Sequence, residues 1–125
     1  MIPQNLLLID DDCNCTTLMK FVLEQDTNWQ ILIATNAEEG ITQAKLKQPD
    51  VILLDVVMSK FDGLDIYKIL KSDFYTSSIP IIFMTAMTPV IPILKSQIAE
   101  DVGIITKPFD VIKLAKQITK MCDRY

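Results

Sequence analysis

Short runs of apolar residues without polar alternation recur along the chain, at residues 6–9, 31–34, 51–54, 81–84 and 104–105. A strand that alternates apolar and polar residues has one face in water, whereas a strand covered on both faces is apolar throughout. These runs therefore predict the five strands of a parallel sheet with helices on both faces.

Segments of helix length separate the apolar runs. Residues 13–25 place Leu18, Phe21, Val22 and Gln25 at helical spacing, so these side chains are expected to form the buried face of a first helix. The acidic residue before this segment, Asp12, is a suitable N-cap for it.

Three more helices follow from the same reasoning. Asn36 can cap a second helix over residues 37–46, which carries acidic residues in its first turn. Further helices are expected from about residue 64 to 71, after Gly63, and over residues 111–121. The apolar positions that should form the buried faces of these two helices are Leu64, Ile66, Tyr67, Leu70, Leu114, Ala115, Ile118 and Met121. Gly63 itself, after Asp62, reads as a turn position that needs a positive φ.

The segment from residue 88 to 100 is the most irregular. Pro89 and Pro92 forbid an ordinary helix interior, but Pro92 suits a first helical position, so a shortened fourth helix is expected to begin near it. Two interpretations of the apolar residues here remain open, core packing and an exposed surface for a partner. These residues are Val90, Ile91, Ile93, Leu94 and Ile98.

The regular alternation of strand and helix predicts the fold class. Right-handed crossovers between parallel strands give an open, doubly wound α/β sheet with helices on both faces. Residues 1–125 are expected to form one domain, because the chain has the size of a single domain and contains no linker or repeat.

Composition and charge exclude several classes of function. Half of the 125 residues are apolar and 22% are charged, so a packed core is expected rather than disorder. The net charge of −4 provides no basic surface for nucleic acid or an anionic membrane. With no histidine in the sequence, Ser-His-Asp and Cys-His catalysis and histidine-containing zinc sites are excluded.

The cysteines and the N-terminus indicate a cytoplasmic protein. Cys13, Cys15 and Cys122 are odd in number and have no C-x-x-C spacing, which indicates a reducing compartment. The apolar run at residues 6–9 stops at three acids and follows no basic segment, so neither a signal peptide nor a membrane span is expected. Cys13 and Cys15 are expected to be small residues that fit at the start of the first helix. A redox-sensing role for these two thiols is a minor alternative.

Polar residues terminate the predicted strands, where a doubly wound sheet binds its ligands. Asp10 and Asp11 follow the first strand and Asp55 follows the third. If these strands are neighbours, the three carboxylates converge, and such a group calls for a cation. Because only oxygen ligands are offered in an open site, Mg²⁺ is favoured over Ca²⁺.

Asp55 also has a second possible role. A carboxylate can attack a phosphoryl group to form an acyl phosphate, and phosphoryl transfer depends mainly on positioning and charge neutralisation. Thr85 ends the fourth strand and Lys107 follows the fifth, so a hydroxyl and an ammonium group could meet the oxygens of the incoming group.

The order of these segments resembles the receiver domain of two-component response regulators. LLLIDDD is similar to the first strand and acidic pair of that family, VILLDVVMSKFDG to the phosphoacceptor strand and loop, IPIIFMTA to the strand with the switch hydroxyl, and ITKPF to the Lys-Pro turn. The resemblance covers the whole chain. It implies the strand order 2-1-3-4-5 of the flavodoxin-like fold and a cis peptide before Pro108.

The resemblance also implies a role for each site residue. Asp55 would be the phosphoacceptor, Asp11 and the carbonyl of Val57 would bind Mg²⁺, and Asp10 would bind it mostly through water. Thr85 would sense the phosphoryl group and Lys107 would contact it. The donor would be a histidine kinase or a histidine phosphotransfer protein, which must be another molecule because this sequence has no histidine.

The expected function is therefore a phosphorylation switch that a partner protein reads. The unknown output partner is expected to bind the face formed by two segments, from Pro92 to Glu100 and from Val111 to Met121. With no further domain expected after residue 125, DNA binding or catalysis on other molecules is not expected. Ile104 stands where the family often has an aromatic ring, so burial of a ring is not expected to carry the signal.

Two other functions compete with this one. A Mg²⁺-dependent phosphohydrolase with an aspartyl nucleophile would want a second acid two residues after Asp55, where Val57 stands. A flavin-binding protein would need a loop rich in Ser, Thr and Gly after the first strand, where the acids would repel the flavin phosphate.

The residues two positions after Asp55 and Thr85 bear on the lifetime of the phosphoryl group. Val57 and Met87 are apolar and offer no help to an attacking water, so slow loss of the phosphoryl group is expected.

Overall fold

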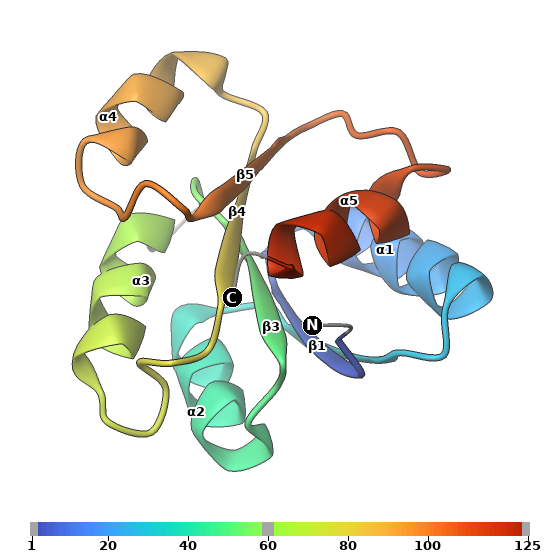
Figure 1. The fold of residues 1–125 in the computed structure, drawn as a ribbon, viewed down its shortest axis with the longest axis horizontal. Coiled ribbons are helices and arrows are strands. Elements are labelled where there is room, and N and C mark those ends of the chain that lie inside the picture. The colour runs from blue at the N-terminus through green and yellow to red at the C-terminus, as the bar shows by residue number, and fades with distance from the viewer. Residues whose placement is uncertain (1–2, 59–61, 124–125) are drawn as a thin grey trace.

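The fold was obtained as a computed structural model, which describes residues 3–58 and 62–123. Strands and helices alternate along the chain (Figure 1). The strands are β1 (Asn5–Ile9), β2 (Gln30–Ala34), β3 (Val51–Asp55), β4 (Ile81–Thr85) and β5 (Gly103–Thr106). The helices are α1 (Cys13–Asp26), α2 (Ala37–Lys47), α3 (Gly63–Ser72), α4 (Ile91–Lys95) and α5 (Leu114–Cys122), with a 3-10 turn at Thr88–Val90.

The five strands form one parallel sheet in the order β2-β1-β3-β4-β5. In the register of the central strands, Ile9 lies beside Leu54, and Asp55 lies beside Met84. The predicted fold class and strand order are thus confirmed. This order places the carboxyl ends of β1 and β3 next to each other, which brings together the residues that follow them.

The core consists of two apolar layers, one on each face of the sheet. Alternate residues of a strand point to opposite faces. In β1, Leu7 and Ile9 join the layer beneath α2, α3 and α4, whereas Leu6 and Leu8 join the layer beneath α1 and α5. Figure 1 shows α2, α3 and α4 to the left of the sheet and α1 and α5 to the right. The residues between the strand ends are apolar because both faces of the sheet are covered.

The predicted buried face of α1 is wrong. Leu18, Phe21 and Gln25 are exposed and Val22 is half-buried, while the helix buries Thr16, Met19 and Leu23. Both sides of this helix carry apolar residues, so its periodicity alone does not determine which side faces the sheet. The Asp12 side chain caps the helix as predicted, accepting hydrogen bonds from the backbone N–H groups of Asn14 and Cys15.

The later helices follow the predicted pattern more closely. Asn36 caps α2 through a hydrogen bond from the backbone N–H of Glu39. The predicted faces of α3 and α5 are buried or half-buried against the sheet. However, α5 begins at Leu114, not at residue 111, because the Asp110 side chain accepts a hydrogen bond from the N–H of Ile112 and holds residues 110–113 in a turn.

In the segment around the fourth helix, some apolar residues pack in the core and others are exposed, so each of the two interpretations of the sequence holds for part of it. The helix α4 is five residues long, with Pro92 in its first turn. Leu94 is buried, and Val90 and Ile98 pack against the core. Ile93 is 61% exposed and is free to contact a partner.

The expectation of a positive φ at Gly63 is wrong, since none of the glycines in residues 3–58 and 62–123 has one. The reason for a glycine here is the close approach of the chain to β3. A Cβ atom on Gly63 would lie 2.2 Å from the carbonyl oxygen of Asp55 and 2.9 Å from Cα of Val56. The N–H of Gly63 donates to the carbonyl of Val56 at 2.7 Å. Gly63 therefore positions the end of β3.

None of the helices in the described residues is both long enough and apolar enough to span a bilayer.

Candidate functional site

Three carboxylates meet at the carboxyl ends of the neighbouring strands β1 and β3. Asp10 and Asp11 follow β1 and Asp55 is the last residue of β3. One oxygen from each lies within 4.8 Å of the others. Asp10 is fully buried and Asp55 is 7% exposed. The convergence predicted from the strand ends is thus present in the structure.

Lys107 joins this cluster from the loop after β5. Its Nζ atom donates a hydrogen bond to Oδ2 of Asp10 at 2.7 Å and lies 3.6 Å from Oδ2 of Asp55. The other oxygen of Asp10, Oδ1, accepts a hydrogen bond from the N–H of Asp12 at 3.0 Å. The peptide bond between Lys107 and Pro108 is cis, as the family resemblance implied. The ammonium group of Lys107 thus lies within 4 Å of a carboxylate oxygen of both Asp10 and Asp55.

The surroundings change the acidity of both partners. Burial and the neighbouring Asp10 carboxylate raise the pKa of Asp55 to about 7, although Lys107 acts in the opposite direction. Burial alone would lower the pKa of Lys107, but the hydrogen bond to Asp10 and the charges of Asp55 and Asp10 raise it overall. A single lysine therefore does not fully compensate the cluster of carboxylates.

Thr85 lies at the end of β4 and is 1% exposed. Its Oγ1 atom accepts a hydrogen bond from the N–H of Met87 at 2.9 Å, and its carbonyl accepts one from the N–H of Lys107 at 2.8 Å. The backbone thus connects Thr85 directly to the loop that carries Lys107. A movement of the hydroxyl group would break its contact with the segment that leads to α4.

Val57 lies two residues after Asp55 and is 47% exposed. Its N–H points to Oδ1 of Asp55 at 3.4 Å, a long hydrogen bond, and its backbone forms an isolated antiparallel bridge with Asp62. The bridge joins the end of β3 to the start of α3. The role of the Val57 carbonyl as a metal ligand stays a prediction.

The donor atoms of the cluster fit a hard divalent cation. Carboxylate oxygens at this separation suit Mg²⁺, which keeps several waters and takes few protein ligands. Burial is the main reason for the raised pKa of Asp55, and the charge of Asp10 adds to it, so a bound cation would favour the ionised form of Asp55. Asp10, Asp11 and Asp55 are the residues that could hold such an ion.

Sequence reasoning predicted the convergence of Asp10, Asp11 and Asp55 but missed one contact of the cluster. Lys107 was expected to meet an incoming phosphoryl group, whereas its closest contact in the structure is Asp10. No pattern in the sequence indicates this pairing, because the two residues are 97 positions apart. The only available signal was charge, since buried carboxylates require a cationic partner.

Cys15, near the site, does not show the features of a reactive thiol, while Cys13 is exposed. Cys15 is half-buried, and its Sγ atom lies 3.8 Å from Sδ of Met19. Burial raises the pKa of the Cys15 thiol, which disfavours the reactive thiolate. Burial also raises the pKa of Cys122, to about 11.

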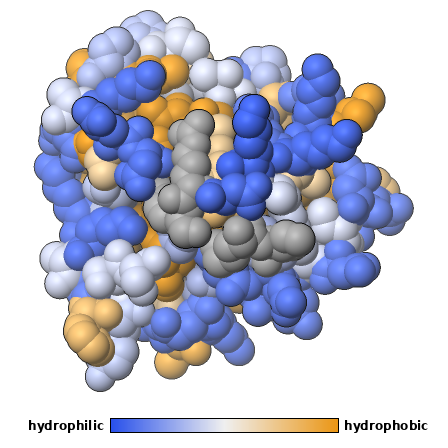
Figure 2. Space-filling model, viewed as in Figure 1, coloured by the Kyte–Doolittle hydropathy of each residue, from blue (hydrophilic) through white to orange (hydrophobic). Residues whose placement is uncertain are grey.

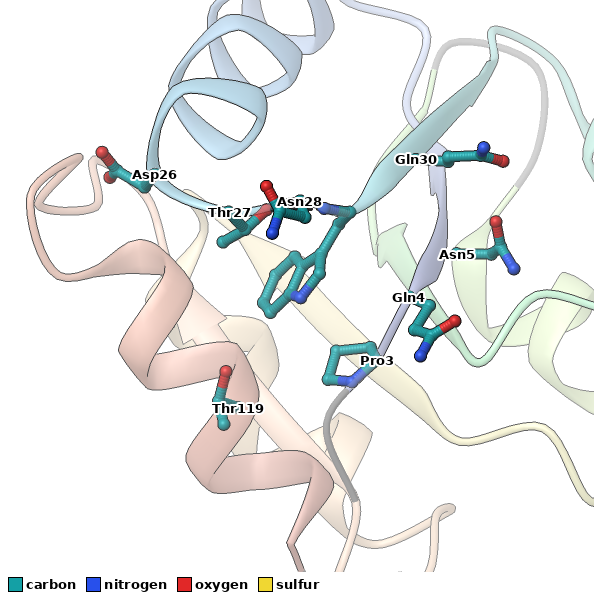
Figure 3. A pocket seen from close by; sticks show the side chains of 9 residues that line it. Pro3, Gln4, Asn5, Asp26, Thr27, Asn28, Gln30 and Thr119 are labelled. Carbon is teal, nitrogen blue, oxygen red and sulfur yellow. Dashed lines mark hydrogen bonds between the residues drawn. The ribbon is translucent and has the colours of Figure 1, made fainter.

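A separate hollow of about 720 Å³ lies at the amino ends of β1 and β2, away from the carboxylates. Figure 3 shows Asn5 and Gln30 on these strands, with Asp26 from α1 and Thr119 from α5 across from them. The Thr119 hydroxyl is already engaged with the carbonyl of Ala115. Four of the nine residues that line the hollow are amides and one, Asp26, is charged, so the hollow lacks the convergent charges of the acidic site.

Comparisons with known proteins agree with this geometry. The family model described as the response regulator receiver domain matches residues 6–119. The heme response regulator HssR of Staphylococcus saprophyticus is 29% identical over 119 residues, which are 95% of this chain and 51% of that protein. The transcriptional regulatory protein TrcR of Mycobacterium tuberculosis is 30% identical over 123 residues, which are 98% of this chain and 46% of that protein. This chain therefore spans about half the length of these curated relatives.

A solved structure shows the same fold. The chemotaxis protein CheY4 of Vibrio cholerae superimposes with a TM-score of 0.82 at 23% sequence identity, covering 94% of this chain and 97% of that one. At this level of identity the likeness supports the fold alone.

Proposed function

Because this chain belongs to the response regulator receiver family, we propose that Asp55 accepts a phosphoryl group and that the resulting charge switches a protein-binding face. The donor would be a phosphohistidine on a histidine kinase or on a histidine phosphotransfer protein, since the chain has no histidine of its own. Residues 1–125 would act as one receiver domain in the cytoplasm.

The observation that carries this proposal is the position of Asp55 among Asp10, Asp11 and Lys107. Its carboxylate has an oxygen within 4.8 Å of the other two carboxylates and lies 3.6 Å from the ammonium group. A carboxylate that serves only to stabilise the fold would have a close cationic partner. Here the ammonium group of Lys107 lies closer to Asp10, at 2.7 Å, than to Asp55. Asp55 is thus held in place but kept available as a nucleophile.

The chain's own residues support each part of the transfer. An oxygen of the ionised Asp55 would attack phosphorus as the bond to the donor nitrogen breaks. Lys107 is close enough to contact a phosphoryl oxygen after a small movement from Asp10. When bound at Asp10, Asp11 and Asp55, Mg²⁺ would neutralise charge on the phosphoryl oxygens. The N–H of Val57 already points toward the accepting carboxylate.

The switch is proposed to start at Thr85 and Lys107. A phosphoryl group adds between one and two negative charges and new acceptor oxygens beside both residues. The Thr85 hydroxyl would exchange its contact with Met87 for a contact with the phosphoryl group, releasing the segment before α4. The expected readout is a shift in population of the face formed by α4, β5 and α5, on which Ile93 is exposed.

The proposal assigns the chain no activity on other molecules. Asp55 would be phosphorylated and would lose the phosphoryl group to water, and the chain would catalyse only these reactions of its own side chain. The family match is to a receiver domain and not to a family of enzymes. An unidentified partner protein would read the phosphorylated state.

The proposal is tested by incubating the protein with Mg²⁺ and a small phosphodonor and measuring its intact mass. We expect a mass gain of one phosphoryl group that requires Mg²⁺ and is lost in Asp55→Asn. A matched control is Asp12→Asn, which alters a neighbouring acid but keeps an N-cap for α1, and should still be phosphorylated. Multiple turnover of an unrelated phosphoester would favour a phosphohydrolase instead, and tight retention of flavin would favour a flavin-binding protein.

A further inference from the structure

Three lysines line a groove along α5 and the loop that leads into this helix. The groove has a volume of about 550 Å³, and Thr106 of β5 and Phe109 of the loop also line it. Lys113, Lys116 and Lys120 follow one another at intervals of three and four residues, so they share one face of the helix. Figure 2 shows hydrophilic side chains gathered where Figure 1 places α5. We call this hollow the α5 groove.

The three lysines have no counter-charge in the part of the chain that the structure describes. No carboxylate oxygen there lies within 4.0 Å of their Nζ atoms, whereas Lys20, Lys45 and Lys107 each have such a partner. Asp110 also lines the groove, but its side chain accepts a hydrogen bond from the N–H of Ile112. All three lysines are exposed. The groove therefore presents positive charge on a protein whose net charge is −4.

The stability of α5 does not explain two of these lysines. Lys113 is the N-cap residue and makes no side-chain hydrogen bond to the helix, and Lys116 lies in the first turn. A positive charge near the amino end of a helix is unfavourable, because the helix dipole is positive there. Lys120, in the last turn, is the only one of the three that the dipole favours. Lys113 and Lys116 thus act against the stability of the helix, and such departures from a local rule are expected at functional sites.

The lining of the groove favours a peptide with carboxylates. Besides the ammonium groups it contains the rings of Pro108 and Phe109, so an occupant can place acidic side chains on the lysines and an apolar one on the rings. A nucleic acid would need more cations, since about 6–10 phosphate contacts are common, and the acidic protein as a whole would repel it. An anionic membrane would meet the same repulsion. Three lysines suit a short segment with a few carboxylates.

The groove is continuous with the loop that carries Lys107. Thr106 and Pro108 flank Lys107 in the sequence, and both line the groove. The N–H of Lys107 donates to the carbonyl of Thr85 at 2.8 Å, so a displacement of this loop upon phosphorylation would reach the groove directly. The lysines also lie within the segment from Val111 to Met121, which the sequence assigns to the partner-binding face.

We propose that the α5 groove binds an acidic segment of the partner protein that reads the phosphorylated state. Carboxylates of this segment pair with Lys113, Lys116 and Lys120, and an apolar residue contacts Phe109. The identity of the partner as the reader of the switch rests on the proposed function. The groove itself is present in the unphosphorylated protein and binds carboxylates in that state as well.

NMR titration of the whole, isotope-labelled chain with an acidic peptide tests this site. The peptide consists of Glu, Leu and Ala and has about ten residues, enough to span the roughly 10 Å along the helix from Lys113 to Lys120. We expect shift changes concentrated at Thr106, Phe109 and the three lysines. The expected Kd is about 0.1–1 mM at low salt, and binding should weaken at about 0.5 M NaCl. The same peptide with Gln in place of Glu should cause no such changes.

A triple variant makes the result specific to the groove. Lys113→Gln combined with Lys116→Gln and Lys120→Gln should weaken binding of the acidic peptide about tenfold or more, since each exposed pair contributes a factor of about two to five. Its thermal unfolding should match that of the unmodified protein, because the side chains are exposed and Gln and Lys have similar helix propensities.

The matched control removes three lysines from other surfaces, by Lys20→Gln with Lys45→Gln and Lys47→Gln. It changes the net charge by the same amount and should alter peptide binding by less than about twofold. An equal loss of binding in the two triple variants overturns the proposal, because net charge alone would then explain it. The absence of shift changes at millimolar peptide also overturns it. Lysine-dependent binding of a DNA duplex or of phosphatidylserine vesicles, without binding of the peptide, overturns it in favour of a polyanion.

The same samples separate this inference from the proposed function. The triple variant of α5 keeps Asp10, Asp11, Asp55 and Lys107, so it should gain one phosphoryl group as the unmodified protein does. Phosphorylation of Asp55 without any binding of the peptide overturns the α5 groove as a binding site and leaves the proposed function intact. Lysine-dependent peptide binding by a chain that is never phosphorylated supports the groove and overturns the proposed function instead.

Discussion

Nζ of Lys107 lies 2.7 Å from Oδ2 of Asp10, a contact that joins the loop after β5 to the end of β1 across the intervening strands β3 and β4. The carboxylate of Asp10 is fully buried, so without this ammonium group its charge would be uncompensated in the metal-free protein. The same ammonium group is 3.6 Å from Asp55 and can respond to a change there. Lys107 is thus the counter-charge of Asp10 and lies close enough to Asp55 to be affected by a change there.

Replacing Lys107 should destabilise the metal-free protein. Breaking a buried ion pair on one side leaves an uncompensated charge, so Lys107→Ala is expected to lower the unfolding free energy by about 2–4 kcal/mol in urea titrations at pH 7. Added Mg²⁺ should restore stability. Lys20→Ala, which removes an exposed pair with Glu24, provides the control and should cost less than about 1 kcal/mol. Equal losses for the two variants would show that Lys107 is not the counter-charge of Asp10.

Stability without metal should fall as the pH rises through the titration of Asp55. The folded state holds the Asp55 proton up to a pKa of about 7, whereas the unfolded chain releases it near the ordinary aspartate pKa of 3.8. Between these values the folded state binds more protons, so this group makes folding less favourable with rising pH. Asp55→Asn removes the effect and should be more stable than the unmodified protein by a few kcal/mol, on the order of the pKa difference, at pH 8 but not at pH 4. A stability difference between the two proteins that does not change with pH would contradict this.

Gly63 should tolerate no side chain, because the atoms that a Cβ would meet belong to the backbone of Asp55 and Val56. Gly63→Ala is expected to cost about 2–4 kcal/mol and to slow phosphorylation by displacing the end of β3. In Gly40→Ala the closest atom is Cδ1 of Ile9 at 2.7 Å, the end of a flexible side chain, and helix propensity favours alanine by about 1 kcal/mol. Gly40→Ala should therefore lower the unfolding free energy less than Gly63→Ala does when both are measured by thermal unfolding. The reverse order would refute the explanation.

Thr85 should separate phosphorylation from switching. Thr85→Ala is expected to accept the phosphoryl group at a rate within about threefold of the unmodified protein, since it removes no charge from the site. The NMR shift changes on phosphorylation should shrink in α4 and β5, because the hydroxyl that contacts Met87 is gone. Thr85→Ser keeps the hydroxyl and should keep the response. Unreduced shift changes in Thr85→Ala would show that the signal takes another route.

The phosphoryl group is expected to be lost slowly, over longer than seconds. Val57 and Met87 are 47% and 50% exposed near the site and present no polar group that could orient water. Val57→Asn adds an amide that can do so and should shorten the half-life by about tenfold. The half-life is measured by the decay of the phosphorylated mass after removal of the donor. A half-life of seconds in the unmodified protein would contradict this.

The sequence predicts the fold and the acidic site well because both depend on repeated, local features. Apolar runs without alternation identify strands that are covered on both faces, and parallel order then places the residues after β1 and β3 at one edge. Asp10, Asp11 and Asp55 could therefore be placed together without knowledge of any contact. The same strand ends suggested that Thr85 and Lys107 could meet an incoming phosphoryl group, and the family resemblance added the expectation that Thr85 senses that group.

What the sequence did not predict depends on packing between distant segments. Helix α1 has apolar residues on both sides, and only docking on the sheet selects Met19 and Leu23 over Leu18 and Phe21. The need for glycine at residue 63 arises from its approach to β3, which no local pattern records. The exposure of Phe74 and Tyr75 likewise results from a turn held by Thr76 and Gln48, and aromatic residues in a sequence are ordinarily read as core.

The central claim concerns one side chain, and mapping the modified residue tests it most directly. After treatment with Mg²⁺ and a small phosphodonor, the acyl phosphate can be reduced with borohydride and the altered residue located by peptide fragmentation. The expected result is a single altered residue, Asp55, with Asp10, Asp11 and Asp12 unchanged. Alteration at another carboxylate, or an unaltered chain under conditions in which Mg²⁺ binds, would contradict the claim.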